Sequence, residues 1–166
     1  WADCPAVPPE LVLLPDWLPF NIYRMSSWSR AIVVPLSIIW ASKPFCAVPE
    51  HASLAELVVE SPEARGPVPA RSRQERLWRT IFFGIDRALK AAERLPWKPL
   101  RQRALRKAEA WILARLEKSG GLGAIFPPII NTIFALRCLG YPLDHPKVVS
   151  QLEELRSLGA DAVLLL

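Results

Sequence analysis

Residues 119–142 read SGGLGAIFPPIINTIFALRCLGYP, and this stretch decides the fold. Its three leading glycines permit a tight turn, because glycine adopts backbone conformations that other residues avoid. Pro127 and Pro128 suit the first turn of a helix, where backbone N–H groups lack intrahelical partners. We expect that helix over about 127–139, ending at Gly140. Because it is apolar almost all round, we expect it to be buried.

The rest of the chain also predicts helices, and no segment predicts a strand. Ser26 or Ser27 is a suitable N-cap for a helix within 21–42. The apolar spacing predicts further helices at 74–94, 100–118 and 144–158. We expect irregular structure over 1–20, and a loop over 43–71 with one short helix near 54–59. The fold class is therefore all-α, a series of antiparallel helical hairpins over residues 1–166.

Composition and charge narrow the function. The chain has 166 residues and a net charge of +5, and twelve Lys or Arg face three acids between Arg71 and Lys107. Such a basic block can bind anionic lipid or nucleic acid, or simply increase solubility. Nucleic-acid binding is disfavoured, because the sequence has neither a docking motif nor a continuous basic stripe. The most apolar run, 31–41, is too short to span a bilayer.

Conventional catalytic and metal-binding sets are missing from the sequence. Cys4, Cys46 and Cys138 are widely spaced and lack metal-site neighbours, which favours free or buried thiols. His51 and His145 have no adjacent nucleophile or ligand spacing, which favours capping or solvent contact. We expect no metal and no cofactor.

One candidate site pairs Trp28 with the turn residues Ile125, Phe126 and Pro127. An aromatic face beside apolar groups can bind a hydrocarbon or stabilise a carbocation through the ring quadrupole. The alternative is that these side chains simply fill the core.

A second candidate is the helix that mixes aromatic and basic side chains. Trp78, Ile81, Phe82 and Phe83 alternate there with basic groups such as Arg87. This mixture is typical of helices that lie at an anionic membrane surface. The alternative is a solvated basic face on an ordinary core helix.

Three groups of segments resemble bacterial squalene–hopene cyclases. The first comprises PPELVLLP (8–15), NIYRMSSWSR (21–30) and VVPL (33–36); the second IDRALK (85–90), PLR (99–101) and AEAWI (108–112); the third the opening stretch followed by PLDHP (142–146). The order and spacing of these segments carry the resemblance over nearly residues 1–155.

The resemblance implies part of an α/α barrel, or toroid, of the terpene cyclase type. It implies an enzyme that cyclises squalene to hopene or hopanol by a protonation-initiated carbocation cascade in hopanoid biosynthesis. From their places in the matching segments, five residues would line the substrate cavity and two the substrate channel. The cavity residues would be Trp28, Ile125, Phe126, Pro127 and Asn131, and the channel residues Met25 and Val33.

The resemblance also implies partners and a location. The substrate would be squalene, and the membrane contact would be monotopic through Trp78, Ile81, Phe82, Phe83 and Arg87. The location would be the cytoplasmic face of a bacterial inner membrane, and the full-length enzyme would be a homodimer.

The chain also departs from the family. The acid of these enzymes lies in an Asp-x-Asp-Asp motif, which this sequence lacks, and Leu116 and Leu122 stand where the family's repeat has Gln and Trp. Residues 156–166 do not resemble the expected continuation. We therefore expect a fragment without a catalytic residue, inactive alone. The alternatives are a non-catalytic helical lipid-binding or scaffold protein, or another triterpene cyclase of the same fold.

Overall fold

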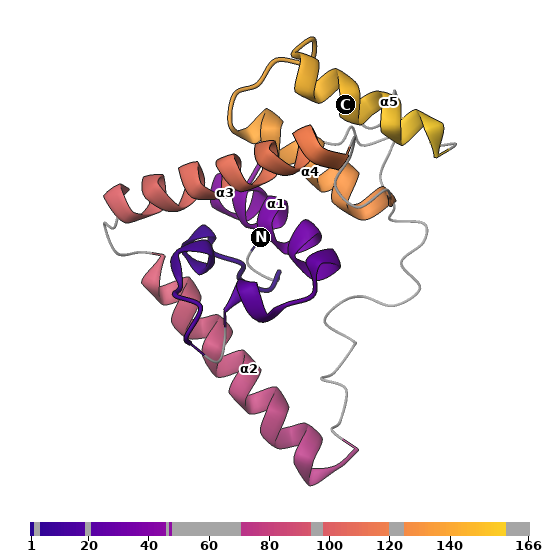
Figure 1. Cartoon of the computed structure of the whole chain (residues 1–166). Helices are drawn as coiled ribbons and strands as arrows, with labels where there is room; N and C mark the ends of the chain where they lie inside the picture. Colours follow the sequence, from indigo (N-terminus) through magenta and orange to yellow (C-terminus); the bar gives the residue numbers. More distant parts are fainter. Residues whose placement is uncertain are drawn as a thin grey trace. The chain divides into compact units, whose positions relative to one another are not determined.

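A computed structural model describes residues 1, 4–18, 21–45, 47, 71–93, 98–119 and 125–158. These residues form helices and connecting turns, without a strand, which confirms the predicted all-α class (Figure 1). The elements are the short 3₁₀ helices η1 (Pro9–Leu13) and η2 (Ile22–Arg24), followed by α1 (Ser27–Ser42), α2 (Arg73–Ala92), α3 (Lys98–Ser119), α4 (Phe126–Cys138) and α5 (Pro146–Ser157). The chain divides into two compact units, one formed by 1–44 with 95–166 and the other by 45–94.

The predicted helices have bounds close to those expected. Both limits of α3, α4 and α5 lie within about two residues of the predicted ones. Several expectations fall outside the described residues, namely the glycine turn at 120–123, most of the loop over 43–71 with its short helix near 54–59, and those for Cys46 and His51. The irregular structure predicted over 1–20 is wrong in part. Pro9–Leu13 forms a 3₁₀ helix with a proline at its start.

Helix α1 shows how local sequence sets its ends. The Ser26 hydroxyl accepts a hydrogen bond from the Ser29 N–H at 3.1 Å, which makes Ser26 the N-cap. The helix continues through Pro35 and ends where Lys43 takes a left-handed conformation at φ 47°. Val34 and Ile38 of this helix are fully buried.

Helix α4 begins one residue earlier than predicted, with prolines in its first turn, and ends before Gly140. Gly140 has a φ of 94°, a conformation that favours glycine and stops the helix. Six side chains of α4 are buried: Pro128, Ile129, Thr132, Ile133, Ala135 and Leu136. The prediction of a buried helix is thus confirmed for most of its circumference, with Phe126, Pro127 and Arg137 exposed.

Helices α1 and α4 pack side by side at the centre of the first unit, with α3, α5 and η1 packed around them. Their carboxyl ends lie close together, because Ser42 of α1 is near enough to Cys138 of α4 to lower the pKa of its thiol, against the larger rise that burial causes. Helices that share a long interface and join at the same ends run in the same direction. The amino-terminal turns of α1 and α4 therefore lie at one end of this pair.

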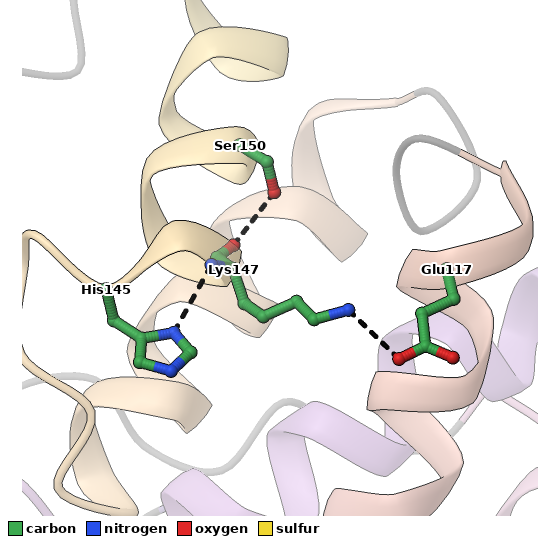
Figure 2. A network of polar contacts seen from close by, with 4 residues as sticks. All are labelled: Glu117, His145, Lys147 and Ser150. Atoms are coloured by element: carbon green, nitrogen blue, oxygen red, sulfur yellow. Dashed lines mark hydrogen bonds and ion pairs between the residues drawn. The ribbon is translucent and has the colours of Figure 1, made fainter.

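Polar contacts link the elements around this pair to one another. Glu10 of η1 accepts from Arg101 of α3 at 2.6 Å. Lys147 of α5 pairs with Glu117 of α3 at 3.1 Å, as Figure 2 shows. His145 caps α5, because its Nδ1 accepts from the Lys147 N–H at 3.2 Å. Of the two roles expected for His145, capping and solvent contact, the structure shows capping.

Helix α2 belongs to the second unit. Its N-cap Ser72 accepts from the Glu75 N–H at 3.0 Å, and the Glu75 carboxylate accepts from the Arg71 N–H at 2.8 Å. Asp86 and Lys90 form an ion pair one turn apart at 2.7 Å. Despite its length, α2 has no buried residue.

Candidate functional site: the amino-terminal ends of α1 and α4

The predicted cavity residues come from two elements. Trp28 lies in the first turn of α1, and Ile125, Phe126 and Pro127 form the N-cap and first two positions of α4. Because the two helices run in the same direction, these turns lie at one end of the pair. Asn131 follows one turn further along α4 and is half-buried. The fold therefore brings both predicted segments to the same end of the core.

Large apolar side chains are left exposed at this end. Trp28 is 56% exposed and Phe126 is 43% exposed, although each lies within a few residues of fully buried core. Pro128 and Ile129, directly after the exposed pair Phe126 and Pro127, are buried. An exposed apolar patch that continues into a core marks a surface suited to a ligand or a further protein segment.

The two predicted channel residues lie before and within α1. Met25 directly follows η2 and is 42% exposed, and Val33 is half-buried within α1. Asn21 fixes this entry by accepting hydrogen bonds from the Tyr23 and Arg24 N–H groups, at 2.8 and 3.0 Å. The backbone that carries Met25 into α1 is thus held by side-chain capping.

The chemistry available at this end is that of an apolar wall. Within the described first turns of α1 and α4 there is no acidic residue. Indole and phenyl rings can contact a hydrocarbon and stabilise positive charge, but they cannot protonate a double bond. These residues can bind and shape an apolar molecule without starting its reaction.

The second candidate set lies on α2 and divides between two faces. At about 100° per residue, Trp78, Ile81 and Phe82 share one apolar face with Leu77 and Ile85. All five are at least 40% exposed. This face is an apolar surface on a helix that buries none of its residues.

Phe83 and Arg87 lie outside that face. Phe83 is turned about 160° from Ile85 around the helix axis. The Arg79 guanidinium lies over the Phe83 ring, 5.8 Å from its centroid. The five predicted membrane-contact residues are therefore one apolar group of three and two members of the basic face.

Sequence reasoning missed two cation–π pairs, formed by aromatic and basic residues of η2 and α3. Lys107 lies over the Tyr23 ring, and Arg115 stacks on Trp111. The signal available in the sequence was the spacing of Lys107, Trp111 and Arg115, which are successive at i, i+4 and i+8. Only the fold shows that Tyr23 lies against Lys107.

The described residues contain neither a membrane-spanning helix nor a metal-binding group. None of the described helices combines the length and apolarity needed to cross a bilayer. Among the same residues, no group of three or more His, Cys, Asp or Glu side chains is arranged to hold a metal ion.

An all-helical core with an apolar end agrees with the comparison to known families. The family model for the squalene-hopene cyclase N-terminal domain matches residues 1–162, and the chain belongs to this family. This confirms the resemblance carried by the three groups of sequence segments.

Individual relatives agree with the family assignment. The chain is 36% identical over 146 residues to a squalene–hopene cyclase of Bradyrhizobium diazoefficiens, covering 88% of this chain and 22% of the relative. It is 35% identical over 164 residues to the squalene–hopene cyclase of Alicyclobacillus acidocaldarius, covering 97% and 25%. It is also 35% identical over 150 residues to a dammaradiene synthase of Dryopteris crassirhizoma, covering 89% and 21%. The chain thus spans about a fifth to a quarter of the length of these relatives.

Proposed function

We propose that this chain is the N-terminal part of a triterpene cyclase and that it forms one wall of a cavity for squalene. The observation that carries the proposal is the shared end of α1 and α4, where Trp28, Phe126 and Pro127 are exposed beside a buried core. The family membership supports the same substrate class, since several relatives are squalene–hopene cyclases. Because neither helix start carries an acid, the proposed role is to fold the polyene and stabilise its cations.

A domain exchange tests this proposal. Residues 1–158 replace the matching segment of the Alicyclobacillus acidocaldarius enzyme, and conversion of squalene to hopene is measured by gas chromatography. We expect the chimera to form hopene and the 166-residue chain alone to form none. In the chimera, Trp28→Ala should lower turnover by at least tenfold or redirect the product, because a cavity ring that contacts cations is lost.

The matched control is Trp17→Ala, which removes the same ring from a side chain that is 73% exposed. Trp17→Ala should leave turnover unchanged. Equal losses from the two substitutions would contradict the cavity role of Trp28. A chimera that folds, binds squalene and forms no cyclised product would favour a lipid-binding or scaffold protein instead. A different cyclised product would favour another triterpene cyclase of the same fold.

We propose further that α2 contacts a membrane surface as a monotopic element. Support comes from its exposed face of Leu77, Trp78, Ile81, Phe82 and Ile85, opposite a face rich in Arg and Lys. An amphipathic helix of this kind inserts its apolar face among acyl chains while its basic groups meet anionic lipid. Arg87 and Phe83 belong to the basic side in this arrangement. A cytoplasmic-face location at a bacterial inner membrane and a full-length homodimer stay predictions from the family resemblance.

Neighbouring phenylalanines provide a matched test of this membrane contact. Phe82 and Phe83 are 63% and 59% exposed but lie on different faces of α2. Phe82→Ser should weaken binding to phosphatidylglycerol vesicles several-fold in a co-sedimentation assay, and Phe83→Ser should weaken it much less. Equal losses, or no loss from Phe82→Ser, would show that this apolar face does not contact the bilayer.

A further inference from the structure

The first turn of α5 takes one of its hydrogen-bond acceptors from a histidine side chain. Pro146 occupies the first position of this helix and has no N–H group. The carbonyl of His145 accepts from the N–H groups of Val148 and Val149, at 2.8 and 3.0 Å. The Lys147 N–H donates instead to Nδ1 of the His145 imidazole, at 3.2 Å (Figure 2). This first-turn bond therefore depends on a group that titrates.

The bond to Lys147 requires a neutral imidazole. A neutral imidazole can carry its proton on Nε2 and accept at Nδ1, whereas a protonated imidazole donates from both nitrogens and accepts at neither. The Lys147 N–H and a protonated Nδ1 would be two donors facing each other. The added charge would also lie at the amino end of a helix, where the helix dipole disfavours a cation. Protonation of His145 thus removes the cap and adds a repulsion.

The first turn of α5 is coupled to other parts of the first unit. Val148, directly after Lys147, is fully buried. The Lys147 ammonium pairs with Glu117 of α3 at 3.1 Å (Figure 2). Helix α5 also packs along α4. A first turn that loses its cap would therefore weaken contacts with two other helices.

The groups around His145 include both signs of charge. They come from the connection before α5, from α5 itself, from α3 and from α4, and they are Tyr141, Asp144, Lys147, Glu109, Glu117 and Arg137.

Most of these groups have partners of their own. The Tyr141 ring meets the imidazole edge-on, with centroids 4.7 Å apart, and its hydroxyl donates to Glu109. Arg137 donates to the Tyr141 carbonyl at 2.8 Å. Asp144 precedes His145 and is exposed, so its attraction for a protonated imidazole is screened by water. The loss of the cap is therefore the larger effect of protonation.

We propose that His145 is a pH-sensitive switch at the start of α5, in which protonation of the imidazole releases the Lys147 N–H and loosens the first turn. The folded chain favours the neutral imidazole, because only that form accepts the bond. The cap therefore stabilises the fold above the range in which histidine titrates, about pH 6.5, and this stabilisation is lost as the pH falls through that range. This switch goes beyond the proposed cyclase function, and its test uses no squalene.

The chain has two histidines, so replacing His51 leaves His145 as its only imidazole. The test compares His51→Asn with two double variants, which add His145→Asn or His145→Ala, each in the full 166-residue chain. Asparagine caps a helix without titrating, and alanine does not cap. Urea unfolding at about pH 7.5 and about pH 5, on either side of the histidine range, gives the folding constant of each chain. Groups that the three chains share titrate alike and cancel in the ratios.

We expect the folding constant of His51→Asn to fall about fivefold relative to the His145→Asn double variant between the higher and the lower pH, as loss of one cap would. It should exceed that of the His145→Ala double variant at the higher pH and approach it at the lower. An unchanged ratio to the His145→Asn double variant would overturn the proposal. A ratio that rises at the lower pH would overturn it too, because the surroundings would then favour the protonated imidazole.

Hydrogen exchange distinguishes a local switch from a general loss of stability. In His51→Asn, the Lys147 amide should lose protection at the lower pH, while the amide of Ile133, in the buried part of α4, should lose much less. The His145→Asn double variant should keep its protection at Lys147. Equal losses at Lys147 and Ile133 in His51→Asn would show global unfolding and would contradict a switch at the start of α5.

Discussion

At the scale of single residues, side-chain contacts between distant segments hold the first unit together. The Tyr141 hydroxyl donates to a Glu109 carboxylate oxygen at 2.6 Å, and its ring meets that of His145 edge-on, with centroids 4.7 Å apart. This contact ties the turn after α4 to α3, while the cap at His145 starts α5. A single tyrosine thus positions the connection between three helices.

Replacing this tyrosine tests the contact. Tyr141→Phe should lower the free energy of unfolding by about 1 kcal/mol at neutral pH, because it removes one hydrogen bond to a partly exposed carboxylate. The hydrogen bond to Glu109 raises the pKa of Tyr141 above its ordinary value, with burial and the Glu109 charge adding to the effect. The stabilisation is therefore complete below the unfolded tyrosine pKa of about 10 and is lost as the pH rises through the folded value.

Urea unfolding of the wild type and Tyr141→Phe at a series of pH values measures this effect. The two curves should differ near pH 7 and converge in strongly alkaline solution. A difference that stays constant across the whole range would contradict the assignment to the Tyr141–Glu109 bond.

At the scale of elements, α4 and α2 illustrate opposite uses of apolar residues. In α4 they are buried on most sides, and Ile133 is only 2% exposed. In α2 they gather on one face and stay at the surface, and Ile85 is 50% exposed. The sequence predicted both helices and the stripe on α2, because periodicity is a local property.

The same substitution in both helices measures this contrast. Ile133→Ala should destabilise the chain by about 2–5 kcal/mol, since it leaves a cavity in the packed core between α1 and α4. Ile85→Ala should change stability by less than about 0.5 kcal/mol. Thermal or denaturant unfolding of the two variants gives both values. A large loss from Ile85→Ala would show that the apolar face of α2 is covered within this chain.

At the scale of the whole molecule, this chain corresponds to one part of the longer cyclases that it resembles. It spans about a fifth to a quarter of the length of the relatives it matches, and it lacks an Asp-x-Asp-Asp motif. The proposed division of roles follows, with one cavity wall and one membrane helix here and the protonating acid elsewhere. The chimera is the decisive experiment at this scale, because it supplies the missing acid from a known relative.

The candidate sites were only partly accessible from the sequence. Trp28 and the turn residues Ile125 and Phe126 were predicted as cavity residues from their aromatic or apolar side chains and from the family resemblance. The parallel course of α1 and α4, which places them at one end of the core, depends on packing between segments about 100 residues apart. The contact of Lys107 with Tyr23 could not be predicted from the sequence, because α3 and η2 are far apart along the chain.

The sequence by itself determined the helices α1 to α5 and the cap at Ser26 and the stop at Gly140, because prolines, glycines and capping serines act within a few residues of where they stand. It also determined the family, through the three groups of matching segments. The tertiary structure alone decided that the apolar face of α2 stays exposed and which charges face one another. Burial and electrostatics depend on contacts between distant residues, and those contacts exist only once the chain has folded.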